Sequence, residues 1–278
     1  MTQPMMTLND GRRMPQMGTG IWQISDDATP KVVSRALELG YRLIDGAAAY
    51  GNERGMGQGI RDSGVARDEI FVTSKLWNDA QGHDAALRAF DATMERCGLD
   101  HLDLYLIHWP LPLMDAYVET WRALIRLRDE GRVRSIGVAN FHEAHLTRLI
   151  DETGVVPALN QIELHPSLTQ APLRAANARL GIVTQSWTPL GRGDSFEAPA
   201  VTGPAARLDC SPAQVILAWH LQHGLSVIPK SENPDRLAEN LAALEIRLTE
   251  AEIAAIDALD RGHRTGSDPE TFDYREPL

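Results

Sequence analysis

The stretch LYLIHWPLPLMDAYVETWRALIRLRDEGRVRSIGV, residues 104–138, indicates the fold class. It begins with a short apolar run at 104–107 and ends with a second one at 133–138. Between them, apolar residues at 121–127 have helical spacing, which stops at Gly131. A helix between two short apolar runs is typical of a βαβ unit, because parallel strands need such a crossover connection. The stretch therefore predicts a parallel sheet with helices packed against it.

The same alternation repeats on both sides of this stretch. Helical spacing ends at Gly40 and again at Gly98, and capping boxes begin further helices at Ser211 and Thr249. Short apolar runs bounded by polar residues predict eight strands, at 18–22, 41–44, 70–74, 104–107, 133–138, 158–162, 182–186 and 225–228.

This repeat over 278 residues, with no linker or change of composition near the middle, predicts a single (β/α)8 barrel domain over residues 1–278. A doubly wound sheet followed by a second domain is the alternative. Residues 1–17 contain the turn residues Leu8-Asn-Asp-Gly11 and predict a hairpin lid under the barrel. The tail, residues 261–278, lacks periodicity and is either a disordered end or a loop, which we expect over the active-site face.

Composition excludes several classes of protein. The net charge of −11 argues against a protein that binds nucleic acid. Cys97 and Cys210 lie far apart, and the histidines of residues 142–145, HEAH, lack the H-E-x-x-H spacing, so we expect no disulfide framework and no metal. No apolar run approaches the roughly 18 residues of a membrane span, and no signal peptide is recognisable. We expect a cytoplasmic protein without a membrane partner.

Candidate site residues follow from the barrel itself. Barrel enzymes keep their active sites at the carboxyl ends of the strands, so the residue at each predicted strand end is a candidate. A polar strand end is ordinarily just solvated, but here most of the residues titrate, donate hydrogen bonds or stack. They are Trp22, Asp45, Lys75, His108, Asn140, Gln161, Trp187 and Lys230.

Four titratable groups are expected to meet at one end of the barrel. Asp45, Lys75 and His108 end neighbouring strands, and Tyr50 lies in the loop that Asp45 begins. The Lys75 cation is expected to lower the pKa of Tyr50 from its usual value near 10, and Asp45 to keep the lysine protonated. His108 can hydrogen-bond a substrate oxygen. The alternative is an Asp45–Lys75 ion pair that only stabilises the barrel.

A second candidate site lies at residues 230–236, KSENPDR. Asn233 is predicted to cap a helix, whose exposed N–H groups would form a phosphate pocket with Lys230, Ser231 and Arg236. An ordinarily capped helix with solvated charges is the alternative. The sequence has no G-x-G-x-x-G fingerprint and no G-K-[ST] phosphate loop, which disfavours a Rossmann-type cofactor site.

Five blocks of sequence resemble the aldo-keto reductase family, and the prokaryotic reductases of the diketogluconate type look closest. The likeness runs from Leu8 to the tail and rests on residues 45–53, 104–110, 134–141, 160–163 and 228–231. This resemblance implies an oxidoreductase that reduces a carbonyl with NADPH. It implies that Tyr50 is the general acid, that Lys75 and Asp45 tune it, and that His108 orients the carbonyl.

The resemblance also implies a set of cofactor-binding residues. It places Asn140 and Gln161 on the nicotinamide carboxamide, Trp187 on the ring, Lys230, Ser231 and Arg236 on the 2′-phosphate, and Glu239 and Asn240 near the adenine, with Leu190 also beside the cofactor. Three departures from the family pattern suggest a weaker grip. Ala139 replaces a serine, Gly46 replaces a threonine, and Glu232 adds a negative charge beside the phosphate cluster, which leaves NADH as a weaker alternative.

The substrate is expected in a pocket lined by Trp22, Trp77, Trp109, Leu111 and Phe141, together with the tail. Such an aromatic pocket favours a carbonyl compound with an apolar or flat part. Sugar-derived ketones, dicarbonyls, aromatic aldehydes and steroid-like ketones all fit this description. Two other functions fit the sequence: a Schiff-base aldolase or isomerase that uses Lys75 as nucleophile, and a catalytically weak NADPH-sensing interaction protein. The resemblance suggests a monomer.

Overall fold

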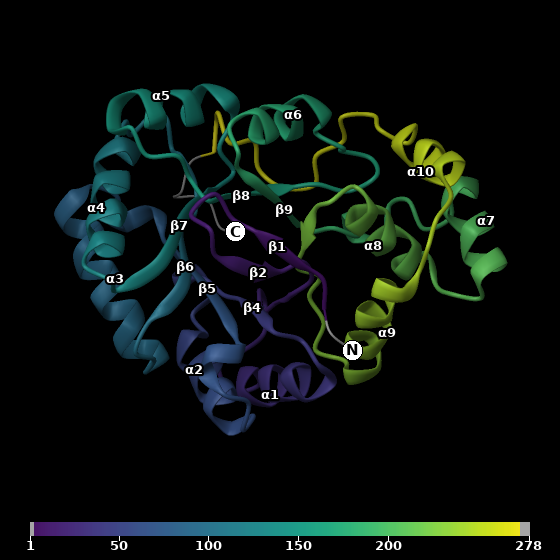
Figure 1. The fold of residues 1–278 in the computed structure, drawn as a ribbon, viewed down its shortest axis with the longest axis horizontal. Coiled ribbons are helices and arrows are strands. Elements are labelled where there is room, and N and C mark those ends of the chain that lie inside the picture. The colour runs from purple at the N-terminus through teal and green to yellow at the C-terminus, as the bar shows by residue number, and fades with distance from the viewer. Residues whose placement is uncertain (1–2, 273–278) are drawn as a thin grey trace.

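Eight parallel strands form the centre of the protein in the computed structural model, which describes residues 3–272 (Figure 1). They are β3 Thr19–Gly20, β4 Leu43–Asp45, β5 Phe71–Leu76, β6 Leu102–Ile107, β7 Val133–Ala139, β8 Leu159–Glu163, β9 Val183–Trp187 and β10 Ser226–Val227. Each pairs with the next along the chain. Bridges Met17–Val227 and Gly20–Lys230 bring the first strand against the last, so the sheet is a nearly closed barrel. The predicted fold class is confirmed.

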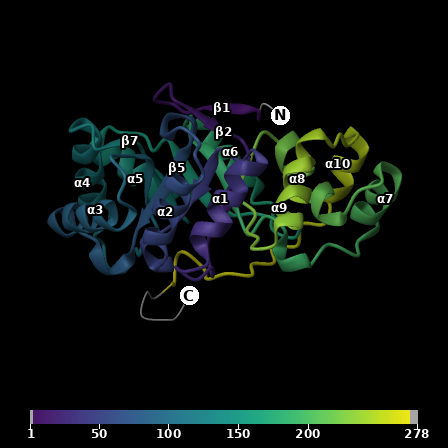
Figure 2. The same cartoon turned by 90° about the horizontal axis from the view of Figure 1, so that it is seen from below.

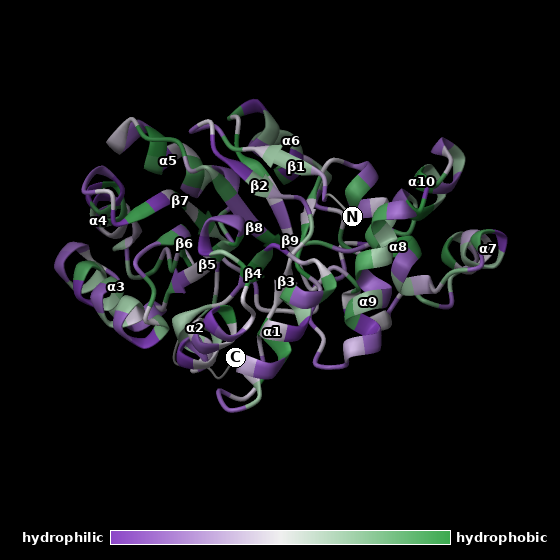
Figure 3. Ribbon diagram, turned by 60° about the horizontal axis from the view of Figure 1, so that its bottom comes forward, coloured by the Kyte–Doolittle hydropathy of each residue, from purple (hydrophilic) through white to green (hydrophobic). Residues whose placement is uncertain are grey.

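Helices surround this barrel (Figure 1). They are α1 Thr29–Leu39, α2 Glu53–Asp62, α3 His83–Cys97, α4 Tyr117–Asp129, α5 Glu143–Thr153, α6 Ala171–Arg179, α7 Pro199–Leu208, α8 Pro212–Gln222, α9 Pro234–Ala242 and α10 Glu250–Asp257. Figure 3 shows hydrophobic residues on the inward faces of the helices and hydrophilic residues on their outer faces. This is the amphipathic pattern that burial of one helix face requires. No helix within residues 3–272 is long and apolar enough to span a membrane.

The helix boundaries follow the local signals in the sequence. Gly40 and Gly98 end α1 and α3 with φ angles of 111° and 59°, the left-handed conformation that glycine adopts without strain. At the start of α8, Ser211 Oγ accepts a hydrogen bond from the backbone N–H of Gln214 at 3.2 Å. Thr249 caps α10 in the same way. Both predicted capping boxes are confirmed.

The hairpin and the tail lie at opposite ends of the barrel (Figure 2). Strands β1, Met5–Thr7, and β2, Arg13–Pro15, pair antiparallel and close the bottom, where Leu8 and Met14 pack against the apolar side chains inside the barrel. The predicted hairpin lid is therefore confirmed. The described part of the tail is a loop over the active-site face rather than a disordered end, and residues 273–278 lie outside the described residues.

Strand ends differ from the prediction in ways that matter for the site. Lys75, which follows the predicted strand 70–74, lies inside β5, so its side chain belongs to the barrel interior and not to the loop that follows. The strands β3 and β10 are shorter than predicted, because isolated bridges replace a continuous ladder where they meet.

Candidate active site

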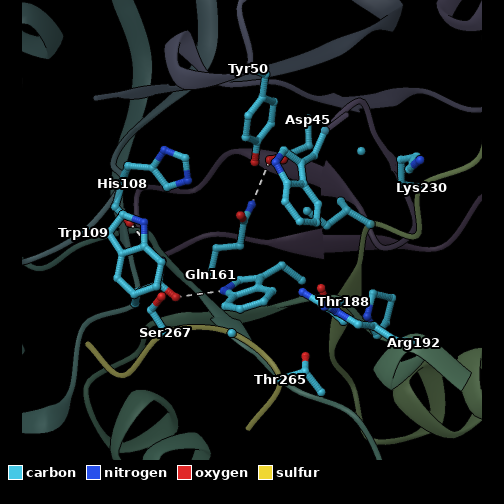
Figure 4. A pocket seen from close by; sticks show the side chains of 17 residues that line it. Asp45, Tyr50, His108, Trp109, Gln161, Thr188, Arg192, Lys230, Thr265 and Ser267 are labelled. Atoms are coloured by element: carbon cyan, nitrogen blue, oxygen red, sulfur yellow. Dashed lines mark hydrogen bonds between the residues drawn. The ribbon is translucent and has the colours of Figure 1, made fainter. Parts of the chain in front are cut away.

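A cavity of about 370 Å³ opens at the carboxyl ends of the strands (Figure 4). His108 and Trp109 lie along one wall, Lys230 lies on the opposite side, and Thr265 lies away from Tyr50 (Figure 4). The residues around the cavity are Gly20, Trp22, Asp45, Tyr50, His108, Trp109, Asn140, Gln161, Trp187, Thr188, Pro189, Arg192, Ile228, Lys230, Thr265, Gly266 and Ser267. Seven of the eight predicted strand-end residues therefore line one cavity, and the eighth, Lys75, lies directly behind it.

Lys75 is the centre of the charged cluster. Its Nζ atom donates hydrogen bonds to Asp45 Oδ1 at 2.6 Å and to the backbone carbonyl of Gly46 at 2.8 Å. The Tyr50 hydroxyl, brought in by a short 3-10 turn at Ala48–Tyr50, lies 3.4 Å from the same nitrogen. Lys75 is fully buried, so this ion pair is shielded from water.

The pKa values of this cluster follow from burial and from the neighbouring charges. Burial lowers the pKa of Lys75, but attraction to Asp45, then to Tyr50, and its hydrogen bonds outweigh burial and raise it above its usual value. Burial raises the pKa of Tyr50, and the opposing effect of Lys75 is smaller. Lys75 thus acts on the Tyr50 pKa in the predicted direction, but the pKa as a whole lies above its usual value because desolvation of the phenolate dominates.

His108 follows β6 and faces the cavity beside Tyr50. Burial first, and the nearby Lys75 cation second, hold the pKa of His108 well below its usual value, so the imidazole is neutral at neutral pH. Its Nδ1 atom is buried without a hydrogen-bond partner among residues 3–272. The other ring nitrogen, Nε2, is thus the one available to a ligand in the cavity. The His108 ring packs edge-on against Tyr50 and Trp77, with centroids 5.9 and 5.1 Å apart.

The residues predicted to hold a nicotinamide carboxamide form a hydrogen-bonded network. Gln161 Nε2 donates to Asp45 Oδ2 at 2.8 Å and to Gln185 Oε1 at 2.7 Å. Both N–H groups of Gln161 are thus used, and its Oε1 atom has no hydrogen bond from the described residues. Asn140 Nδ2 donates to the His108 carbonyl at 2.9 Å, and Asn140 Oδ1 accepts from Trp187 Nε1 at 2.8 Å.

The predicted phosphate pocket is only partly as expected. Asn233 caps α9, and its Oδ1 atom accepts hydrogen bonds from the N–H groups of Asp235 and Arg236 at 2.8 and 3.2 Å. These helix N–H groups are therefore already occupied, contrary to the expectation that they are free. Lys230 and Arg236 are exposed, while Ser231 is buried. An anion at this end of α9 depends on side chains rather than on the helix terminus.

Other predicted cofactor residues lie beyond the cavity. Glu239 and Asn240 follow on α9, Glu239 half-buried and Asn240 buried. Leu190 is half-buried against the apolar core and does not contribute to the described cavity wall.

The substrate pocket differs from the prediction. Trp22 and Trp109 line the cavity, whereas Trp77, Leu111 and Phe141 are absent from its described wall. Leu111 packs with Trp109 behind the wall, with Trp77 partly buried against the same cluster. Phe141 is fully buried, with its ring centroid 5.6 Å from that of Tyr117. The assignment of these three side chains to the substrate stays a prediction.

Sequence reasoning missed some lining residues in the loop after β9. Thr188, Pro189 and Arg192 all contribute to the cavity wall. Thr188 and Arg192 have φ angles of 48° and 54°, which turn the loop sharply. Thr188 directly follows Trp187, so it would have been a candidate if the residue after each strand end had also been considered. The glycines at 191 and 193 signal a turn around Arg192, but they do not indicate that its side chain faces the cavity.

Comparison with known proteins agrees with this geometry. The sequence model of the Aldo/keto reductase family matches residues 14–199 and 197–261. The chain belongs to the aldo-keto reductase family. An aldo-keto reductase of Mycolicibacterium smegmatis is 52% identical to this reductase over 271 residues, 98% of both chains. The methylglyoxal reductase DkgA of Yersinia pestis is 50% identical over 272 residues, 97% of this chain and 98% of its own length.

A solved structure extends the comparison. The crystal structure of a mutant of Gox0644 in complex with NADPH superimposes with a TM-score of 0.94 at 47% identity, covering 98% of this reductase and 100% of that chain. The family predicted from the sequence is confirmed, and the protein is an NAD(P)H-dependent oxidoreductase. Its residues fit a nicotinamide cofactor: Gln161 presents a carbonyl oxygen without a partner among residues 3–272, and the indole of Trp187 lines the cavity.

Proposed function

We propose that this reductase converts a small carbonyl compound to an alcohol with NADPH, and that Tyr50 donates the proton. The observation that carries this proposal is the Tyr50 hydroxyl, which lies at the cavity 3.4 Å from the buried Lys75 cation. Carbonyl reduction needs a proton donor beside the carbonyl oxygen. Tyr50 is the group in the cavity wall that has both a proton at neutral pH and a cation behind it.

Each residue of the cluster has its own role. Tyr50 is protonated at neutral pH, as a phenol with a pKa near or above 10 must be, and it donates this proton to the carbonyl oxygen. Lys75 stabilises the phenolate that remains, and Asp45 keeps Lys75 charged. The neutral His108 offers Nε2 to the same carbonyl oxygen and orients it. When bound, the nicotinamide supplies the hydride.

The cofactor assignment rests on three parts of the chain. Gln161 Oε1 can accept a hydrogen bond from the carboxamide, and Asn140 can join it after exchanging its hydrogen bond to Trp187. Trp187 offers its face to the ring. The side chains of Lys230 and Arg236 are exposed and can bind a 2′-phosphate. The remaining predicted cofactor contacts are Ser231, Glu239, Asn240 and Leu190. NADH, which lacks this phosphate, is the weaker cofactor.

The substrate class follows from the cavity. A volume of about 370 Å³ shared with a nicotinamide leaves room for a compact molecule. The DkgA relatives are named methylglyoxal reductases, so a small dicarbonyl is the first substrate to test. We propose methylglyoxal or a compound of its class, with Trp22 and Trp109 in contact with its apolar part.

Turnover of the Tyr50→Phe variant tests this proposal. Consumption of NADPH with methylglyoxal should fall by roughly a hundredfold to ten-thousandfold, because proton donation is lost. Binding of NADPH, measured by fluorescence titration, should hardly change. Tyr105→Phe, at a buried tyrosine outside the described cavity wall, is the matched control and should keep its turnover.

The same experiment separates the two rival functions. Equal turnover in wild type and Tyr50→Phe, with tight NADPH binding, would favour a cofactor-sensing protein. Trapping of methylglyoxal on Lys75 by borohydride without nicotinamide would favour Schiff-base chemistry. The resemblance also implies that the reductase acts as a monomer, which sedimentation tests.

A further inference from the structure

Glu163, the last residue of β8, is a buried carboxylate to which the proposed reaction gives no role. Its hydrogen-bond donors come largely from the tail. Oε1 accepts from the backbone N–H of Thr265 at 2.6 Å and from the hydroxyl of Thr265 at 2.7 Å. Oε2 accepts from the backbone N–H of Gly266 at 3.1 Å and from the Arg264 guanidinium at 3.3 Å. Glu163 thus anchors residues 264–266 to the barrel.

This anchor is charged at every working pH. Burial raises the pKa of Glu163, but hydrogen bonds from His165, Thr265 and Gly266 outweigh burial and lower it to about 2. Hydrogen bonds to a charged acceptor are stronger than those to a neutral one. The anchor therefore holds the tail more firmly than a neutral side chain of the same shape can.

The anchored residues touch the cavity and its stacking surface. Thr265, Gly266 and Ser267 line the cavity. Gly266 lies directly against Trp187, since a methyl group added to it would come within 2.5 Å of Cη2 and 3.2 Å of Cζ3 of the indole. The opposite edge of this indole donates its N–H to Asn140 Oδ1 at 2.8 Å. Trp187 is thus held between Asn140 and the tail.

The tail is fixed separately at its other end. We call residues 264–272 the strap. Glu270 Oε1 lies 2.7 Å from His142 Nδ1, and Phe272 packs on Trp109 with ring centroids 4.3 Å apart. The strap therefore has one contact region at Glu163 and Trp187 and a second at α5 and Trp109. Because the two regions use different residues, a variant of Glu163 removes contacts only from the first.

We propose that Glu163 is a positioning residue: it holds the strap against Trp187 and so fixes the indole in the orientation that receives the nicotinamide ring. This inference rests on the proposed function, which assigns Trp187 to the cofactor. Glu163 itself lies outside the described cavity wall. Its effect passes through Gly266, and therefore appears in cofactor binding and hydride transfer rather than in proton donation.

The test compares Glu163→Gln, Gly266→Ala and Glu270→Gln in the full-length protein. The first weakens the anchor without changing its volume. The second keeps the Glu163 carboxylate and adds a methyl group whose nearest neighbour is Trp187 Cη2 at 2.5 Å, with Glu163 Oε2 at 3.2 Å. Glu270→Gln weakens only the contact between the strap and His142, and it is the control. NADPH dissociation constants are measured by tryptophan fluorescence, and hydride transfer by the primary isotope effect with NADPH deuterated at C4 of the nicotinamide.

Glu163→Gln is expected to weaken NADPH binding about tenfold, the scale of a charged hydrogen-bond acceptor lost. Gly266→Ala should act in the same direction, and Glu270→Gln should leave the dissociation constant unchanged. In Glu163→Gln and Gly266→Ala the isotope effect should change while the pH profile of turnover keeps its shape. Unchanged NADPH binding in both variants would overturn the inference, even if Glu163→Gln unfolds at a lower temperature.

Further variants cover the case in which Glu163→Gln does not fold, and measurements on the wild type separate this inference from the proposed function. If Glu163→Gln does not fold, Gly266→Ala and Thr265→Val decide, because Thr265→Val removes one hydrogen bond to the carboxylate and leaves the carboxylate itself in place. Failure of the proposed function shows in wild type, as a lack of NADPH binding or as undiminished turnover in Tyr50→Phe. Failure of the present inference shows only when wild type binds NADPH and the strap variants bind it equally well.

Discussion

Lys75 Nζ lies 2.6 Å from Asp45 Oδ1, and both side chains are almost completely buried. Removing one partner from such a pair leaves an uncompensated charge in a medium of low dielectric constant. Asp45→Asn should therefore destabilise the fold by about 3 kcal/mol or more. It should also lower the pKa of Lys75, since burial is then less strongly opposed.

Urea unfolding measures this effect, and a double variant provides its control. Asp45→Asn with Lys75→Met removes both charges, so it should be more stable than Asp45→Asn alone. If Asp45→Asn unfolds at the same urea concentration as wild type, the pair does not contribute to stability as argued.

The pH dependence of reduction should follow Tyr50. The tyrosine must be protonated to donate, and its pKa lies above the usual value near 10 because burial outweighs the effect of Lys75. The rate of hydride transfer should therefore be flat up to about pH 9 and fall only on the alkaline side of about pH 10. Because burial and Lys75 hold the pKa of His108 well below 6.5, no loss of rate should centre near pH 6.5. Stopped-flow NADPH oxidation across this range measures the profile. A break near pH 6.5 that His108→Gln abolishes would contradict it.

The barrel and the charged cluster could be predicted because both depend on local patterns. Alternating apolar runs and helical spacing give the order of elements, and parallel strands in one barrel bring their carboxyl ends together. Asp45, Lys75 and His108 had to meet once these strands were placed. Tyr50 follows because a loop of four residues separates it from Asp45.

The orientation of several side chains around the pocket could not be predicted, because it depends on backbone conformations that the sequence does not signal. Leu111 and Asn140 have φ angles of 45° and 64°, a left-handed conformation uncommon for residues other than glycine. After Asn140 the chain changes direction, and Phe141 packs into the core instead of the cavity. Glu163 and Thr265 are 102 positions apart in the sequence, so no local or periodic pattern indicates that they are in contact.

Gln185 should influence cofactor binding although it lies outside the described cavity wall. Its Oε1 atom accepts from Gln161 Nε2 at 2.7 Å, and its own Nε2 donates to Ser226 Oγ at 2.9 Å. These two hydrogen bonds fix the orientation of the Gln161 amide, so that its Oε1 atom is available to a ligand. Gln185→Met should raise the KM for NADPH several-fold, about one lost hydrogen bond, with little change in the KM for the carbonyl. Steady-state kinetics with each substrate varied separately measures this. Equal changes in both KM values would indicate a general loss of structure.

Glu232 should reduce the preference for NADPH over NADH. Its Oε1 atom lies 3.8 Å from Lys230 Nζ, at the surface, and competes with a 2′-phosphate for this cation. Glu232→Gln should raise the ratio of kcat/KM for NADPH to that for NADH by about two- to fivefold, the scale of exposed charge pairs. Lys230→Met is the control of opposite sign and should lower the ratio. The effect should shrink in 1 M salt, which screens exposed charges. A ratio unaffected by both variants would remove Lys230 from the phosphate site.

Glu163 should also determine part of the stability of the protein in acid. Its pKa in the folded protein is about 2, compared with about 4.5 when the chain is unfolded. A carboxylate with a lowered pKa contributes stability above its unfolded pKa and loses it as the pH falls toward the folded value. This contribution is about 3 kcal/mol for a shift of this size. The difference in unfolding free energy between wild type and Glu163→Gln should therefore shrink by about that amount between pH 5 and about pH 2, because the variant has no group to titrate there. Urea unfolding at several pH values measures it, with Glu270→Gln as the control because that carboxylate is exposed. A difference that stays constant across this range would mean that Glu163 is not the charged anchor of the strap.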